Sequence, residues 1–124
     1  MASELRVNTL KDASGNNSIA TSFVAGGSAK AWVNFNGTGT IATRDSLNVS
    51  GLTDNGTGDY AYAISSAFTN TNYAASVTGR QGGYIGGFYH SGSSASSTRV
   101  FVASDSGAAI DGDVVACGNL GDLA

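Results

Sequence analysis

Residues 26–60, GGSAKAWVNFNGTGTIATRDSLNVSGLTDNGTGDY, contain the clearest strand pattern of the chain and its two strongest turn signals. Apolar residues alternate with polar or amphipathic ones over residues 31–36, and this period of two predicts a half-buried strand. The Asn-Gly pair at 36–37 then predicts a tight turn at positive φ. Residues 54–59, DNGTGD, repeat the signal. We therefore predict three or four antiparallel strands in this stretch.

The rest of the chain also shows short extended patterns and little helical periodicity. Further strands are predicted at residues 4–10, 18–25, 47–52, 60–64, 73–78, 98–103 and 114–117. The glycine-rich residues 79–87 fit a bulged strand or a flexible loop, and the Ser/Gly-rich residues 91–97 fit a loop tip. About eight short strands at hairpin spacing predict an all-β fold, an antiparallel β-sandwich or jelly-roll-like domain with an N-terminal strand or arm.

Two parts of the chain are expected to have different roles. Residues 1–25 are predicted to form an N-terminal arm or hairpin for attachment or trimer interlocking, and residues 26–124 a single β-sandwich. Leu5 and Val7 share one side of the extended pattern at 4–10. Such a segment is long enough to add a strand to a neighbour's sheet. The alternative is that it forms the first strand of its own domain.

The composition favours a protein whose surface is covered by other chains. Of 124 residues, 12% are charged, which is half of the usual quarter, and 18 are glycine. One interpretation is a Gly/Ser-rich surface with mobile loops. The one that we favour is a surface covered by neighbouring copies, where charge would be costly to desolvate. The absence of proline, a residue that protects exposed sheet edges, agrees with this interpretation.

Charge and hydropathy argue against several partners. The net charge is −3 and the six basic residues are scattered, so nucleic-acid binding is not expected. No apolar run approaches the length of a membrane span. The N-terminus lacks the apolar core of a signal peptide, so synthesis in the cytoplasm is expected. The single cysteine, Cys117, cannot form an internal disulfide.

The residues that most often carry chemistry form no recognisable catalytic or metal-binding motif. His90 and Cys117 would be a conceivable nucleophilic pair, but Cys117 lies in an apolar strand pattern and fits a small core residue better. Five aspartates in Gly-rich turns suggest a cation site or ordinary turn residues: Asp54, Asp59, Asp105, Asp111 and Asp113. We predict no enzyme activity, no cofactor and no metal.

The aromatic residues have both structural and binding interpretations. Trp32 is expected in the core or at a subunit interface. Tyr84, Phe88, Tyr89 and His90 are candidates for outward receptor contacts, for example by stacking on a sugar. The alternative for these residues is packing in the core or against another subunit.

Three strings carry a resemblance to a known class of protein: SELRVNTLKDASGNNSIATSF, GSAKAWVNFNGTGTIATRDSLNVSGLTDNGTGDY and the closing GDLA. They resemble small virion proteins of tailed bacteriophages, notably marine ones, often labelled tail-fibre or structural proteins. The resemblance covers the first half and the C-terminus, whereas residues 63–113 look like a variable part. It implies a non-enzymatic β-structured protein that assembles on the particle, commonly as a trimer.

The resulting hypothesis is a bacteriophage virion structural protein, a homotrimeric capsid decoration, cement or short spike subunit. Its partners would be the major capsid protein or tail proteins, and its location the virion. The alternative is a tail-fibre receptor-binding module that contacts a host surface glycan. The candidate trimer or attachment residues are Leu5, Val7, Trp32 and Phe35.

Overall fold

The computed structural model describes residues 3–80 and 84–124. In this part of the chain an N-terminal hairpin of β1 (Thr9–Lys11) and β2 (Ser18–Ala20) leads into helix α1 (Thr21–Gly27). Eight longer strands follow: β3 (Ala29–Asn36), β4 (Ala42–Leu47), β5 (Val49–Gly56), β6 (Asp59–Ile64), β7 (Ala74–Arg80), β8 (Tyr84–Ser94), β9 (Ser97–Ser104) and β10 (Val114–Leu120). The all-β prediction is confirmed.

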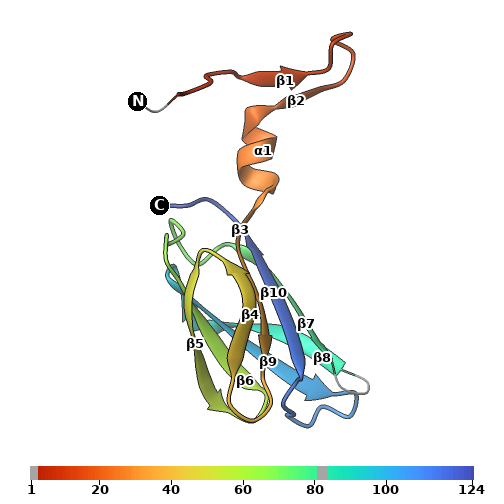
Figure 1. Cartoon of the computed structure of the whole chain (residues 1–124), viewed down its shortest axis with the longest axis vertical. Helices are drawn as coiled ribbons and strands as arrows, with labels where there is room; N and C mark the ends of the chain where they lie inside the picture. The colour runs from red at the N-terminus through yellow and green to blue at the C-terminus, as the bar shows by residue number, and fades with distance from the viewer. Residues whose placement is uncertain (1–2, 81–83) are drawn as a thin grey trace.

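The eight longer strands form two antiparallel sheets that pack face to face as a sandwich. One sheet has the strand order β4-β3-β10-β7 and the other the order β5-β6-β9-β8 (Figure 1). Three sequential hairpins, β3-β4, β5-β6 and β8-β9, each stay within one sheet. The last strand, β10, pairs with β3 on one side and with β7 on the other, so it is a central strand of the first sheet.

The core follows from the alternation seen in the sequence. In β3, alternate residues from Ala31 to Phe35 are buried, as the pattern predicts. The ring of Phe35 packs edge to face against that of Tyr60, which belongs to the other sheet, and the ring centroids are 5.2 Å apart. The remaining large core side chains come from both sheets and from the connection between β6 and β7: Val33, Tyr62, Ile64, Phe68, Tyr73, Val100, Val102 and Val115. The sandwich is therefore stabilised by its own interior.

The predicted strand at 18–25 is wrong in its second half, where α1 forms. The strand pairing ends at Thr9 and Ala20, and the amide of Thr21 makes a last bond, of 3.0 Å, to the carbonyl of Asn8. Beyond it, β2 has no partner strand, so a helix satisfies the backbone groups internally. Lys30 Nζ then bonds the carbonyls of Ala25 and Ser28 at the end of α1.

The predicted strand at 47–52 is divided between the two sheets. Asn48 has a left-handed backbone, with φ at 57°, and it separates β4 of one sheet from β5 of the other. Its side-chain amide donates to the carbonyls of Lys30 and Ser66, each at 3.0 Å, and its Oδ1 accepts from the Ser66 amide at 2.7 Å. These bonds fix the corner, which the sequence pattern did not reveal.

The turn after β3 also differs from the prediction. The residue with positive φ there is Gly39, at 62°, and not Gly37. A larger residue would not fit at position 37, because a Cβ there would lie 2.6 Å from the Tyr60 hydroxyl and 2.9 Å from the Gly112 carbonyl. In the turn after β5 the prediction holds, since Gly56 and Gly58 both have positive φ.

The N-terminal segment, residues 3–28, stands apart from the sandwich. Figure 1 shows the β1-β2 hairpin and α1 beyond one end of the two sheets, connected to them through β3. None of residues 3–28 is buried. Helix α1 continues through Gly27, past the expected boundary at residue 25, and the sandwich begins with Ala29. In the described ranges, no helix is both long enough and apolar enough to cross a membrane.

Candidate functional site

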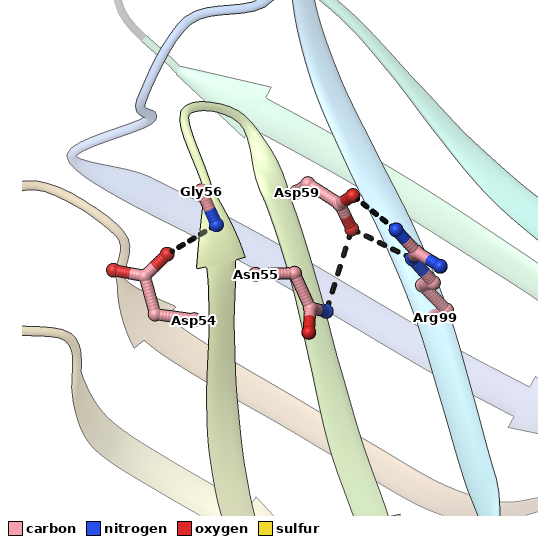
Figure 2. Close-up of polar contacts among 5 residues, drawn as sticks. All are labelled: Asp54, Asn55, Gly56, Asp59 and Arg99. Carbon is pink, nitrogen blue, oxygen red and sulfur yellow. Dashed lines mark hydrogen bonds and ion pairs between the residues drawn. The ribbon is translucent and has the colours of Figure 1, made fainter.

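A polar site lies at the β5-β6 turn, where the sequence shows the string DNGTGD. Asp54 Oδ1 accepts a 2.9 Å bond from the Gly56 amide and shapes the turn. Figure 2 shows Asp59, just after the turn, between Asn55 and Arg99. The glycines at 56 and 58 take up left-handed conformations that other residues adopt at a cost. The turn therefore places the Asp59 carboxylate at the beginning of β6.

Asp59 and Arg99 form a two-bond ion pair on the outer face of the sheet β5-β6-β9-β8. Arg99 Nε donates to Oδ1 at 2.9 Å, and Nη2 donates to Oδ2 (Figure 2). The register pairs Asp59 with Phe101 and Ala61 with Arg99, so the two charged residues are diagonal neighbours. Hydrogen bonding from Arg99 lowers the pKa of Asp59, and its positive charge lowers that pKa further. The carboxylate is therefore ionised at neutral pH.

Two aromatic rings lie beside this ion pair. Tyr89 of β8 and Phe101 of β9 have ring centroids 4.8 Å apart, and the Arg99 guanidinium carbon lies 5.5 Å from the Tyr89 centroid. Arg99 is therefore held by a carboxylate on one strand and an aromatic ring on another. We call these four side chains, Asp59, Tyr89, Arg99 and Phe101, the Tyr89 platform.

Glycines in β8 make room for the platform. A Cβ at Gly87 would overlap the ring of Phe101, and a Cβ at Gly92 would lie 2.6 Å from Cδ of Arg99. The Gly-rich sequence around residue 87 is thus part of strand β8, whose pairing with β9 is continuous from Tyr84 to Tyr89 and shifts register only beyond Tyr89. It lets the side chains of β9 lie over the backbone of β8.

A shallow pocket of about 270 Å³ adjoins the platform. It is lined by Thr57, Gly58, Asp59, Tyr89, Phe101, Val102, Ala103, Gly107 and Ala109. Gly58, which lines the pocket, is held in place by Asp111. Asp111 Oδ1 accepts a 2.8 Å bond from the Gly58 amide and lies 2.9 Å from the Tyr60 hydroxyl. Burial, and then the hydrogen bond with Asp111, raise the pKa of Tyr60 above its usual range, so this phenol stays neutral.

The structure separates the four candidate receptor residues. Tyr89 is 42% exposed on the outer face, whereas Phe88 packs against the core, with its ring centroid 5.6 Å from that of Tyr73. His90 is exposed, and its ring lies at a steep angle to that of Phe88, with the two ring centroids 6.0 Å apart. The side chain of Tyr84 lies outside the described residues. Tyr89 alone of the other three belongs to the platform.

The sequence reasoning missed the remaining platform residues, Asp59, Arg99 and Phe101, as a binding set. A signal was present, because the alternation in 98–103 places Arg99 and Phe101 together on the face opposite Val100 and Val102. What the pattern could not supply is the identity of the neighbouring strands.

His90 and Cys117, considered above as a conceivable nucleophilic pair, lie on strands of different sheets. Cys117 is buried in β10, and burial raises the pKa of its thiol to about 12. His90 is exposed on β8 of the other sheet. Within the described ranges, no three His, Cys, Asp or Glu side chains lie close enough to hold a metal ion.

The candidate attachment residues also differ in accessibility. Leu5 is 82% exposed and Val7 is 39% exposed, both in the N-terminal segment. Trp32 is half-buried on the outer face of β3, beside Leu47 and Gly118 in the register. Phe35 is fully buried in the sandwich core and has no surface to offer a partner.

The hairpin in the N-terminal segment is ordered by its own polar contacts. Asp12 accepts bonds from Ser14 Oγ at 2.8 Å, the Asn16 amide at 3.0 Å and Asn17 Nδ2 at 2.7 Å. Side-chain hydrogen bonds, first from Ser14 and then from Asn17, lower the pKa of Asp12. Across the hairpin Leu10 pairs with Ile19, so both apolar side chains lie on one face.

Comparisons with known proteins give no relative: no family model, no curated protein and no solved structure matches this chain.

Proposed function

We propose that this chain is a non-enzymatic structural protein of a bacteriophage virion, assembled as a homotrimer and serving as a capsid decoration, cement or short spike subunit. The resemblance of its N-terminal half to small virion proteins supports this proposal. One structural observation carries it further. The N-terminal segment exposes six large apolar side chains: Leu5, Val7, Leu10, Ile19, Phe23 and Val24.

Burial of these side chains against a partner would stabilise a segment that is marginally stable alone. A two-stranded hairpin is marginally stable in water, and a helix of seven residues is shorter than the ~12–15 residues that an isolated helix needs. The segment has no buried residue in the single chain. Association with other copies would bury the Leu10–Ile19 face and Phe23, which is 72% exposed. Cyclic symmetry lets one sequence bury the same face in each copy.

The same segment is suited to attachment. It extends beyond the end of the sandwich (Figure 1), and the apolar core of the sandwich is complete without it. In the proposed arrangement the sandwich faces outward and the segment joins the copies to one another and to a capsid or tail protein.

The test is the solution mass of the full chain and of two variants. The full chain should show three times the 12.4 kDa of one chain by light scattering. The double variant Leu10→Ser/Ile19→Ser should shift the mass toward that of one chain, while circular dichroism keeps its β signal. Leu123→Ser is the matched control, because Leu123 is 39% exposed and lies outside the segment. A full chain that stays monomeric at micromolar concentration would overturn the trimer.

A particle map tests the virion role. Density for the sandwich at capsid threefold or hexon positions is expected for a decoration protein. Density at the tail would favour the second candidate, a tail-fibre receptor-binding module. The observation that favours this second candidate is the exposed ring of Tyr89 beside the Asp59–Arg99 pair.

A further inference from the structure

The Tyr89 platform presents apolar and polar groups together on one accessible face. Tyr89 is 42% exposed, and the side chains of Arg99 and Asp59 are 40% and 24% exposed. Phe101 is partly buried and supports the Tyr89 ring from the side. The four side chains come from three strands, β6, β8 and β9, so the sheet itself sets their spacing.

The platform is organised before any ligand arrives. Phe101 lies over Gly87 and the Arg99 stem over Gly92, where any larger residue would displace them. Arg99 is fixed further by two bonds to Asp59. Side chains that are already ordered lose little rotamer entropy on binding, which favours recognition of a small ligand.

The charge balance selects the class of ligand. Asp59 and Arg99 neutralise each other, so the platform offers no free cation for a phosphate or a carboxylate. Asp111, behind Gly58, adds negative charge nearby and disfavours anions further. The Arg99 guanidinium already lies over one side of the Tyr89 ring, so a ligand cation would compete with Arg99 there, while the ring keeps an exposed part for an uncharged group. A neutral ligand fits best.

We infer that the Tyr89 platform and the adjoining pocket bind a neutral saccharide. A sugar ring has an apolar C–H face that can stack on Tyr89, and vicinal hydroxyl groups that can accept from Arg99 and donate to Asp59. The pocket, at about 270 Å³, is near the low end of small-ligand sites, about 300 Å³, which suits a single terminal sugar. This inference rests on the second candidate function and assigns it a site.

The test is binding of the full chain to an array of neutral glycans ending in glucose, galactose, mannose or N-acetylglucosamine, with sialylated glycans alongside. The best neutral glycan is then titrated in solution and followed by NMR. Tyr89→Ala and Arg99→Ala should each weaken binding about tenfold or more, since each removes a directly contacting group. Tyr89→Phe keeps the ring and should bind within about threefold of the original protein.

Arg44→Ala is the matched control for Arg99→Ala. Arg44 is an exposed arginine on β4 of the other sheet, bonded to Asn34 and to the Asp113 carbonyl, so its loss should leave glycan affinity unchanged. The inference is overturned if no neutral glycan binds, if sialylated glycans bind in preference, or if Tyr89→Ala binds as well as the original protein.

Light scattering of the same samples separates this inference from the proposed assembly. A monomer that binds a neutral glycan would support the platform and overturn the trimer. A trimer that binds no glycan would support the proposed assembly and overturn the platform as a glycan site.

Discussion

The Tyr62 hydroxyl donates a 2.6 Å hydrogen bond to Oδ1 of Asn119 inside the sandwich core, and this bond joins the two sheets. The chain of bonds continues from Asn119 Nδ2 to Thr98 Oγ1 at 3.0 Å, and from Thr98 to the Tyr73 hydroxyl at 3.0 Å. Asn119 and Thr98 are fully buried. Each member finds a partner, so the polar groups fix how the sheets pack without an unpaired donor between them.

Replacing Asn119 by alanine should destabilise the sandwich. The variant leaves Tyr62 and Thr98 without their buried partner, which typically costs about 1–3 kcal/mol of unfolding free energy. Urea denaturation followed by circular dichroism measures the change. Asn55→Ala is the matched control, because Asn55 is exposed and should alter stability by less than about 0.5 kcal/mol. Equal effects of the two variants would contradict a structural role for the network.

Two glycines with similar φ should respond very differently to alanine. Gly58, at φ 67°, faces the Val102 carbonyl, which a Cβ would overlap, and the Ile110 carbonyl at 2.8 Å. Gly39, at φ 62°, has open space around it. Gly39→Ala should cost about 1–2 kcal/mol from the left-handed conformation alone. Gly58→Ala should cost clearly more in the same denaturation assay. Similar losses would show that the backbone near Gly58 yields to the new methyl group.

Alanine variants of Trp32 and Phe35 should distinguish a residue that stabilises assembly from one that stabilises the fold. Phe35→Ala removes a fully buried ring and should cost about 3–5 kcal/mol at any protein concentration. Trp32 lies half-buried on an outer sheet face, so Trp32→Ala should cost the single chain less. If Trp32 packs against another copy, the loss should depend on concentration over a roughly hundredfold range. A concentration-independent loss as large as that of Phe35→Ala would place Trp32 in the folding core instead.

Alkaline conditions should reveal the burial of Cys117. Its pKa is raised to about 12 by burial, from 9.0 for an ordinary thiol. Between these values the folded chain keeps a proton that the unfolded chain releases, so stability falls as pH rises, by up to about 1.4 kcal/mol per pH unit. Burial raises the pKa of Tyr62 in the same direction. Urea titrations of the original protein and of Cys117→Ala from pH 8 upward should show the stability difference between them changing above pH 9. A constant difference would contradict the shift.

Much of the fold could be predicted from the sequence, because the alternation of side chains along a strand is a local property. The alternation put Val33 with Phe35, Tyr60 with Tyr62, and Val100 with Val102 on shared strand faces, and in the structure each of these faces is the buried one. The DNGTGD turn was equally clear, since Gly56 and Gly58 carry the positive φ that the turn requires. Local patterns failed where a segment changes its partner. Thr21 begins a helix once β2 has nothing left to pair with, and Asn48 turns the chain from one sheet to the other.

By itself, then, the sequence determined which residues share a strand face, where the DNGTGD hairpin turns and that the fold is all-β, because these depend on a period of two and on the conformations open to glycine and asparagine. Only the tertiary structure decided which strands lie side by side. Strand order brought Asp59 of β6 beside Tyr89 and Arg99 of the β8-β9 hairpin, on one face of the sheet, although Asp59 and Arg99 are 40 residues apart in the chain. Strand pairing over long sequence separations reflects the packing of the whole core, which no local pattern encodes.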